Sequence, residues 1–568
     1  MTTFLSPWSS YHRRLLATTL ALLVVVTAPA AVVEAARGMV SSTHPLATRI
    51  GVDVLKSGGN AVDAAVAVAF ALGVVDGHNS GVGGGAFMLI RRSGGEFIAL
   101  DGRETAPATA TRDMFIRNGK GDPELSQTGP LASGVPGAVA LYEQAVRDYG
   151  RKRLSELVFP AAKLAEGGFA LSAMGADRLN TNAAALGKFE ATRQIFLKAD
   201  GSPWRKGETL RQADLARSYR AIAQQGSTWF YQGQYAAAVG AWMKENGGIM
   251  TAADFRAYAV RLREPLRTTY RGHTLVGFPP PSSGGVHVAQ ILNILESFDL
   301  RALADTGQRQ HVIAEAMKLA FADRAHWLGD PDFAQVPRGL IGKGYAKALA
   351  ARINPERASV VAGQGVPPDS DPRFFGKHTT HFSVADADGN WVACTATINT
   401  SFGSKVVVPG TGILLNNEMD DFSIQPGVPN HFKLIGSEAN AVAAGKRPLS
   451  SMSPTIVLKN DEPVLAIGAA GGPTIITQVV LGLVGFIDLG WPLDAALAQP
   501  RLHQQWVPDE VRIEQALPAI VRADLIRRGH HVSEVPTIGV SHAVARSPDG
   551  KMFHGAADPR AGGLAAGW

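Results

Sequence analysis

The sequence predicts an α+β protein in which helices and strands form separate layers of a sandwich. Segments with strand-like and helix-like patterns occur in clusters along the chain, which argues against the strict alternation of a doubly wound fold. Residues 135–330 show mainly helical periodicity, whereas β-rich runs follow residue 380. The 568 residues are 46% hydrophobic and 18% charged, which excludes a disordered or fibrous protein. At roughly 150 residues per domain, this length fits three or four domains or one large fused core.

Charge and cysteine content exclude several classes of function. The formal net charge is +6, without clustered Lys and Arg, which is too weak to indicate nucleic-acid binding. A single cysteine, Cys394, excludes an internal disulfide framework and a cysteine-based zinc cluster. The glycine-rich stretch 81–86 precedes a predicted strand, whereas a dinucleotide-binding loop follows one. We therefore expect neither a metal ion nor a cofactor.

The N-terminal segment has the features of a secretory signal. Arg13 and Arg14 precede an uncharged stretch over residues 15–33, whose first half is strongly apolar. The triplet Val33–Ala35 fits the recognition site of a signal peptidase, so we expect residues 1–35 to be removed. An uncleaved membrane anchor is the alternative, because this length can nearly span a bilayer. In either case the protein is exported, and cleavage would leave it in the periplasm or secreted.

The first elements after this segment are a buried helix and a strand pair. Asn60 can cap a helix over residues 61–75, with Asp63 three positions on completing the cap. This helix is apolar nearly all round, which indicates that it is buried. A glycine loop follows at residues 81–85. The expected strand pair is 86–91 and 96–101, joined at Gly94-Gly95.

A Pro-, Asp- and Gly-rich stretch over residues 363–378 looks like an exposed linker between the two parts of the chain. A hairpin follows it, with strands over 380–385 and 391–399 around Asp388-Gly389. If these two residues form the turn, paired positions sum to 777, and Thr379 lies opposite Ile398. A bulge would move this register by one residue. The remaining expected elements are a short strand at 413–415, a hairpin of 454–458 and 463–468 around Asn460-Asp461, and a helix from Pro473 to about Ile487.

Thr379, at the junction of linker and strand, is the first candidate for chemistry. A threonine hydroxyl is a weak nucleophile unless a base stands beside it, and a threonine at a new N-terminus carries that base in its own α-amine. The expected register places Thr397 and Asn399 beside it on the neighbouring strand. Thr397 can then hydrogen-bond the nucleophile, and Asn399 can bind substrate. Taken alone, two threonines that open a strand also reflect ordinary β-propensity.

Gly471-Gly472-Pro473 is the second candidate, where a strand gives way to a helix. Proline fits the first helical position, and two N–H groups beside glycines can hold a developing oxyanion. The alternative is a tight turn that needs glycine for packing.

Three polar groups complete the candidates. The acidic stretch Asn417–Asp421 follows an apolar strand and can bind an ammonium group, although a solvated turn or a calcium loop gives similar patterns. The adjacent hydroxyls of Ser450 and Ser451 can bind a carboxylate or cap a turn. Arg103 lies just after a predicted strand, where a lone arginine is usually a surface ion pair.

Taken together, these residues resemble the gamma-glutamyltranspeptidase family, from about residue 38 to the C-terminus. The matching segments follow in the family's order: Ser57–Ala65, Gly83–Gly85, Leu100–Glu104, Thr379–Ser383, Asn417–Phe422, Arg447–Thr455, Gly471-Gly472 and Asp558–Arg560. The resemblance implies an N-terminal nucleophile hydrolase, with a four-layer αββα sandwich. It also implies a zymogen that cuts itself between His378 and Thr379, leaving a large subunit of residues 36–378 and a small subunit of residues 379–568 as a heterodimer.

The resemblance also implies a role for each candidate residue. Thr379 would attack γ-glutamyl amides such as glutathione, supported by Thr397, with Gly471 and Gly472 forming the oxyanion hole. Arg103, Ser450 and Ser451 would hold the α-carboxylate of the substrate. Asn399, Glu418 and Asp421 would surround its α-amine. This pattern of charges is suited to the two ends of an amino-acid zwitterion. Water, amino acids or peptides would accept the γ-glutamyl group.

Two departures from the family pattern concern the lid and the oxyanion turn. Phe432 stands where many bacterial members with a lid loop have a tyrosine, and a phenyl ring cannot donate a hydrogen bond to Asn399. Ala469-Ala470 replaces the commoner Ser-Pro before the two glycines. A glutaryl-cephalosporin acylase is the competing enzyme, but glutaryl groups lack an α-amine and have no need of Asp421. The third alternative is an exported binding protein that no longer cuts itself.

Overall fold

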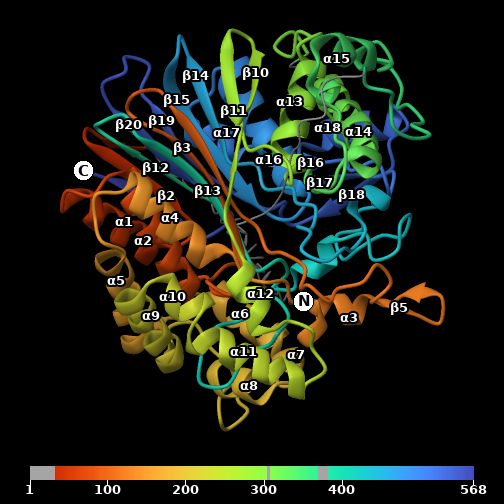
Figure 1. Ribbon diagram of the computed structural model, residues 1–568. Coiled ribbons are helices and arrows are strands. Elements are labelled where there is room, and N and C mark those ends of the chain that lie inside the picture. Colours follow the sequence, from red (N-terminus) through yellow and green to blue (C-terminus); the bar gives the residue numbers. More distant parts are fainter. Residues whose placement is uncertain (1–31, 304–306, 369–380) are drawn as a thin grey trace, which may run out of the picture.

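The computed structural model describes residues 32–303, 307–368 and 381–568. Two seven-stranded antiparallel sheets pack face to face, and helices cover both outer faces (Figure 1). The order helices, sheet, sheet, helices confirms the expected four-layer αββα sandwich.

We name each of the two sheets after one of its inner strands. The β12 sheet has the order β21 (Leu564–Gly567), β2 (Gly38–Ser42), β12 (His381–Asp386), β13 (Trp391–Thr397), β3 (Gly85–Arg91), β4 (Phe97–Gly102), β9 (Arg261–Arg263). The β15 sheet has the order β1 (Val33–Ala35), β20 (Phe553–Ala557), β19 (Val540–Arg546), β15 (Glu462–Ala470), β14 (Thr455–Lys459), β11 (His273–Gly277), β10 (Leu266–Tyr270). Smaller sheets are formed by β16 (Leu502–His503), β17 (Val511–Glu514) and β18 (Val532–Val535), by β5 (Ile116–Arg117) and β6 (Lys120–Gly121), and by β7 (Phe169–Ala170) and β8 (Thr209–Leu210).

The helices form two outer layers and a lobe. Over the β12 sheet lie α1 (Pro45–Lys56), α2 (Ala61–Val75), α4 (Ala138–Tyr149), α5 (Leu154–Gly167) and α9 (Ala213–Gln225). Over the β15 sheet lie α13 (Ser283–Leu295), α14 (Gln308–Trp327), α15 (Lys343–Ala350), α16 (Thr474–Leu483) and α17 (Leu493–Ala498). The others are α3 (Pro123–Gln127), α6 (Ala173–Thr181), α7 (Ala183–Leu186), α8 (Glu190–Phe196), α10 (Ser227–Tyr231), α11 (Gln234–Glu245), α12 (Ala252–Ala257) and α18 (Ala519–Arg527).

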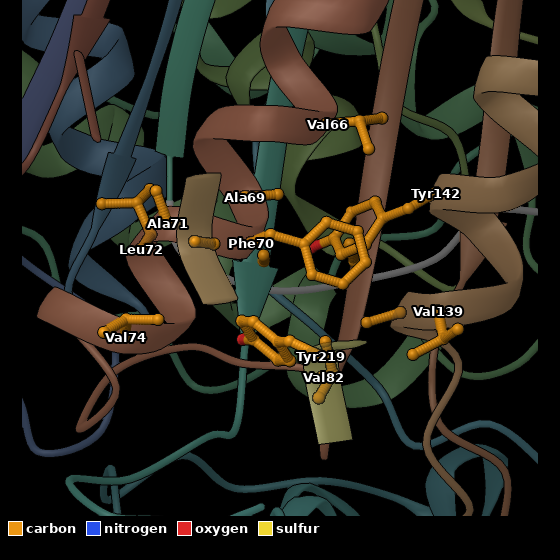
Figure 2. Packing of buried hydrophobic residues seen from close by; sticks show 14 of the residues in the cluster. Val66, Ala69, Phe70, Ala71, Leu72, Val74, Val82, Val139, Tyr142 and Tyr219 are labelled. Atoms are coloured by element: carbon orange, nitrogen blue, oxygen red, sulfur yellow. The ribbon is translucent and has the colours of Figure 1, made fainter. Parts of the chain in front are cut away.

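Three layers of apolar side chains hold the sandwich together. Between the sheets, Phe87 of β3 stacks on Phe278 with ring centroids 4.2 Å apart. Outside the β12 sheet, Phe70 of α2 packs edge-on against Tyr219 and lies at a tilt to Tyr142, as Figure 2 shows. The third layer lies between the β15 sheet and its helices. Every residue of α2 is buried, which confirms the sequence prediction for this helix.

A capping box starts helix α2, as predicted. The Asn60 side chain accepts hydrogen bonds from the N–H groups of Val62 and Asp63, and Asp63 accepts one from the Asn60 N–H. The Asp63 carboxylate also accepts hydrogen bonds from the N–H groups of Arg151 and Lys152. Asp63 therefore joins the start of α2 to the segment between α4 and α5.

The β12–β13 hairpin forms where the sequence places it, but the expected register is wrong by one residue. His381 pairs with Thr395 and Ala385 with Trp391, so paired positions sum to 776. The cause is a three-residue loop: the Asp386 carboxylate accepts hydrogen bonds from the N–H groups of Asp388 and Asn390. Gly389, at φ +89°, completes the turn.

Other expectations have mixed outcomes. The strand pair β3–β4, the hairpin β14–β15 and helix α16 are confirmed. The strand expected at 413–415 is wrong, because only an isolated bridge from Leu414 to Val407 forms. The helical region 135–330 also contains β9, β10 and β11, which the periodicity missed. Most of the linker 363–378 lies outside the described residues.

Val33–Ala35, the predicted cleavage triplet, forms strand β1 and pairs with β20. The boundary of the signal peptide stays a prediction. None of the helices within the described ranges combines the length and apolarity needed to cross a bilayer.

We expect Asp63→Asn to lower the melting temperature measurably. The new amide NH₂ group would face N–H donors, and unpaired buried donors cost roughly 1–3 kcal/mol. Thermal unfolding followed by circular dichroism measures the effect. Asp53→Asn is the matched control, because Asp53 is exposed on α1 and its substitution should change stability by at most about 0.5 kcal/mol. Equal melting temperatures for the two variants would contradict this role of Asp63.

Candidate active site

The residues at the predicted cleavage point, His378, Thr379 and Thr380, lie outside the described residues. The description resumes at His381, the first residue of β12, which is fully buried between the sheets. Its imidazole lies 2.8 Å from the Ser383 hydroxyl and 3.2 Å from the Thr395 hydroxyl. Burial holds its pKa well below the usual value, so this histidine is neutral and acts as part of the core.

Thr397 and Asn399 lie at the end of β13, the neighbour of β12. The Thr397 hydroxyl accepts a hydrogen bond of 2.7 Å from the Asn399 N–H. Asn399 adopts a left-handed conformation, φ +73°, and its side-chain amide donates to the Asn417 carbonyl at 2.9 Å. This turn therefore connects the end of β13 to the acidic stretch that begins at Asn417.

The glycine loop before β3 is required by close packing against β13. A Cβ atom at Gly84 would lie 1.8 Å from the Thr397 carbonyl oxygen, and one at Gly83 would lie 1.9 Å from the Leu414 carbonyl oxygen. These contacts exclude any other residue at the two positions. The loop thus positions Thr397, and its glycines need no nucleotide to explain them.

Gly471 and Gly472 form the turn between β15 and α16. Both have positive φ, +136° and +59°, which favours glycine. Within the described part of the chain, neither N–H group donates a hydrogen bond to another backbone group. Two N–H groups at a helix start suit an oxyanion, as the sequence suggests.

Arg103 lies at the centre of a buried cluster of charges. Its guanidinium donates to Glu418 at 2.5 Å and to Asp421 at 2.7 Å, and it lies 3.5 Å from Glu104. The arginine comes from the end of β4, whereas Glu418 and Asp421 come from a 3₁₀ turn after Asn417. All four residues are at most 2% exposed. The alternative interpretation of Arg103 as a surface ion pair is therefore excluded.

The cluster combines one cation with three carboxyl groups. Burial would lower the pKa of Arg103, but attraction to Glu418, Glu104 and Asp421 raises it above its ordinary value. Burial raises the pKa of Glu104 to about 7 and that of Glu418 well above its usual range, so burial favours the protonated form of both carboxyls. A positive group that entered the site would favour their ionised forms and be attracted by them.

Ser450 and Ser451 lie beside a second buried arginine that the sequence analysis missed. Arg324 of α14 donates to the Ser283 hydroxyl at 3.1 Å and to the Ser451 hydroxyl at 3.4 Å. Ser283 in turn donates to the Ser450 carbonyl. Burial lowers the pKa of Arg324 to about 10, so it stays charged at neutral pH. The available signal was that Arg324 is a charged residue on a helix whose other residues are almost all buried.

Phe432 packs beside the oxyanion turn. A Cβ atom at Gly472 would lie 2.7 Å from the Phe432 ring, and the Phe432 carbonyl accepts a hydrogen bond from Gln505. Within the described residues the ring is half-buried and joins the apolar layer over the β15 sheet. The Phe432 ring cannot donate a hydrogen bond, so apolar contact of this ring holds the loop in place.

One group of side chains has the composition of a metal site. Ligand atoms of His311, Glu315 and His530 lie within 4.8 Å of one another, and all three residues are buried. His311 Nδ1 and His530 Nε2 are 2.7 Å apart, at hydrogen-bonding distance. The Lys318 ammonium lies 3.3 Å from the Glu315 carboxylate. The Glu315 carboxylate also accepts a hydrogen bond from the Ser359 N–H. These contacts tie α14 to the segments around Ser359 and His530 without a metal ion.

Comparisons with known proteins agree with the geometry. The family model described as Gamma-glutamyltranspeptidase matches residues 47–568. The chain is 46% identical to the glutathione hydrolase proenzyme of Escherichia coli K12 over 93% of this chain and 91% of that protein. It superposes on the cephalosporin acylase of Bacillus halodurans with a TM-score of 0.85 and 29% identity, over 100% and 99% of the chains. Helicobacter pylori gamma-glutamyltranspeptidase gives 0.55 and 44%, over 56% of this chain and 92% of that one.

We expect Arg103→Met to destabilise the protein strongly, because three carboxylates lose their buried cation. Breaking a buried ion pair by removing one partner costs roughly 3–5 kcal/mol. Adding Asp421→Asn should recover part of this loss. The melting temperature of the double variant should therefore fall by less than the summed decreases of the two single variants. Arg217→Met, in an exposed pair with Asp214, is the control. Additive melting shifts would show that Arg103 and Asp421 are not coupled.

Proposed function

The chain belongs to the gamma-glutamyltranspeptidase family and is a self-processing enzyme that cleaves γ-glutamyl amide bonds, and we propose the following roles for its residues. The Thr379 hydroxyl is the nucleophile, and His378–Thr379 is the bond that the precursor breaks. Gly471 and Gly472 form the oxyanion hole, while Thr397 supports the nucleophile. The remaining charged and polar residues bind the γ-glutamyl group.

The buried pair of Arg103 and Asp421 is the observation that carries this proposal. The sequence analysis assigns the two residues to opposite ends of a substrate zwitterion, and the structure brings them into direct contact. A side-by-side pair of opposite charges is the complement of an α-amino acid, whose carboxylate and ammonium lie on one carbon. The carboxylate would bind Arg103, with Ser450 and Ser451, while the ammonium would bind Asp421 and Glu418.

The carboxyl groups of the cluster favour the ammonium end. Three of them surround one guanidinium, and burial raises the pKa of Glu104 and Glu418, so a substrate ammonium would supply the positive charge that favours their ionised forms. Asn399 is linked to the ammonium end of the site, because its side-chain amide donates a hydrogen bond to the Asn417 carbonyl. Arg324, next to Ser451, adds a second cation near the carboxylate end.

The reaction is an acyl transfer in two steps. The Thr379 oxygen attacks the γ-carbonyl carbon, and its proton passes to the free α-amine of the same residue. The N–H groups of Gly471 and Gly472 stabilise the negative charge of the tetrahedral intermediate, and one such donor is worth about 3 kcal/mol. The departing amine takes the proton, leaving a γ-glutamyl ester. Water or the amine of an acceptor then releases the group.

Processing uses the same hydroxyl within one chain. The Thr379 oxygen attacks the carbonyl carbon of His378, the peptide bond breaks, and water hydrolyses the resulting ester. This leaves a carboxylate on His378 and a free amine on Thr379. Residues 36–378 and 379–568 would remain together as a heterodimer, because each sheet contains strands from both parts.

The location of the protein and its donor substrates follow from the same proposed function. The N-terminal signal would deliver the precursor to the periplasm or outside the cell, where glutathione and related γ-glutamyl compounds are the donors. Acylase activity on glutaryl substrates is the second candidate, supported by the similarity to a cephalosporin acylase. The buried carboxylates Asp421 and Glu418 favour the glutamyl group, because a glutaryl group brings no positive charge to them.

We expect the purified protein to separate into two bands on a denaturing gel. The smaller band should begin at Thr379 by N-terminal sequencing, and residues 379–568 correspond to about 20 kDa of the 59.9 kDa chain. Thr379→Ala should abolish both cleavage and activity, since it removes the attacking oxygen.

Thr380→Ala is the matched control and should still be cleaved. If Thr380→Ala blocks cleavage and Thr379→Ala does not, the nucleophile is one residue further on. A wild-type chain that stays intact yet hydrolyses γ-glutamyl anilides would refute self-processing as the route to activity.

We expect Asp421→Asn to lower kcat/KM for γ-glutamyl anilides about tenfold to hundredfold, the value of one charge-assisted hydrogen bond. Glutaryl anilides, which have no ammonium, should be spared. Asp420→Asn is the control on the same turn, because Asp420 hydrogen-bonds Ser126 and His431 instead of the cluster. An equal loss with both substrates would make Asp421 a structural residue.

A further inference from the structure

Asp101, near the end of β4, is a fully buried carboxylate at the back of the Arg103 backbone. Its Oδ1 atom accepts a hydrogen bond of 2.9 Å from the Arg103 N–H. Its Oδ2 atom accepts hydrogen bonds from two guanidinium groups, at 3.0 Å from Arg263 and at 3.2 Å from Arg447. One carboxylate therefore holds the backbone of Arg103 and two cations from other parts of the chain.

Arg103 is held at three points in addition to its contacts with the carboxyl groups of the cluster. Asp101 binds its N–H, and its carbonyl accepts a hydrogen bond of 2.7 Å from the Tyr258 hydroxyl. Its Nε atom donates to the Pro448 carbonyl at 3.3 Å. The direction of the guanidinium therefore depends both on the end of β4 and on the segment that contains Pro448.

Arg447 ties this second segment to the same carboxylate. It is buried, its guanidinium donates to Asp101, and its N–H donates to the Asp330 carboxylate at 2.7 Å. Ser450 and Ser451 follow it on the same segment. The ion pair of Asp101 with Arg447 therefore fixes the start of the segment that carries the two serines.

We propose that Asp101 is a positioning residue for the carboxylate end of the donor. Its side chain links Arg103 to the segment of Ser450 and Ser451, which lies far away in the sequence. This inference rests on the proposed function, which assigns these three residues to the α-carboxylate of the substrate. Asp101 acts through them, because it keeps the guanidinium and the two hydroxyls at a fixed spacing.

An Asp101→Asn substitution would break this link while changing the shape of the side chain little. The amide offers one oxygen and one NH₂ group in place of two oxygens. Whichever way the amide is turned, its NH₂ group faces a donor, either the Arg103 N–H or the guanidinium of Arg447. One side of the link is therefore lost, and the spacing of the carboxylate-binding groups is no longer fixed.

The test uses three anilides that differ in their charged groups. The γ-glutamyl anilide has both a carboxylate and an ammonium group, the glutaryl anilide has only the carboxylate, and the γ-aminobutyryl anilide has only the ammonium group. Asp101→Asn should lower kcat/KM about tenfold for the γ-glutamyl and glutaryl anilides, mainly through a higher KM, which corresponds to one charge-assisted hydrogen bond. The value for the γ-aminobutyryl anilide should be nearly unchanged.

This selectivity is the opposite of that expected for Asp421→Asn, which should spare the glutaryl anilide. Loss of overall stability would lower all three values together, so the pattern separates positioning from a general structural role. Competitive inhibition of γ-glutamyl anilide hydrolysis gives the same comparison without turnover. In Asp101→Asn the inhibition constant of glutaric acid monoamide should rise, whereas that of γ-aminobutyramide should not.

Three further variants complete the design. Asp101→Glu retains the charge and should recover part of the loss. Arg447→Lys is the milder variant if Asp101→Asn does not fold, and it should show the same selectivity with a smaller loss. Asp332→Asn is the matched control, because this half-exposed carboxylate binds Arg263 at 2.8 Å and 3.1 Å, and it should leave the ratios of the three kcat/KM values unchanged.

Two results would overturn the proposal. One is an equal loss with all three anilides in Asp101→Asn and Arg447→Lys. The other is an unchanged kcat/KM for the γ-glutamyl anilide in both variants, with thermal unfolding showing that they are folded. A wild-type protein that hydrolyses no γ-glutamyl anilide would instead refute the proposed function.

Discussion

The interior position of β12 is the constraint on which the rest of the site depends. This strand hydrogen-bonds to β2 on one side and to β13 on the other, inside a seven-stranded sheet. Strand β13 ends at Thr397, and the glycine loop before β3 admits the backbone of β13 at close range.

The charge cluster adds a second constraint to this frame. A buried guanidinium among three carboxyl groups is costly unless each charge has a partner. Burial raises the pKa of Glu104 and Glu418, which favours their protonated forms and offsets part of this cost. Under the proposed function, an ammonium group that entered the cluster would favour the ionised forms, which is the basis for preferring an α-amino acid over a simple acyl group.

Phe432 packs on Gly472, beside the turn for which we propose the oxyanion role. The Phe432 carbonyl accepts a hydrogen bond from Gln505, which holds this loop next to the turn.

Local sequence patterns determined much of this protein. The capping box of Asn60 and Asp63, helix α2, the hairpins and the glycine turn after β15 follow from residues close together in the chain, so each was predictable. The family resemblance added the four layers and the proposed roles of Thr379 and the substrate-binding residues. The periodicity did not find β9 to β11, because strands of three to five residues are too short to show a clear apolar alternation.

Only the tertiary structure decided the contacts between distant segments. The hairpin register depended on one side chain, Asp386, that caps a three-residue loop. Arg103 and Asp421 are far apart in sequence, and no local pattern shows that they form an ion pair or that the pair is buried. Arg324 reaches the Ser451 hydroxyl from helix α14. Hydrogen-bond and charge partners across the core are set by how the layers pack, which the chain order alone does not specify.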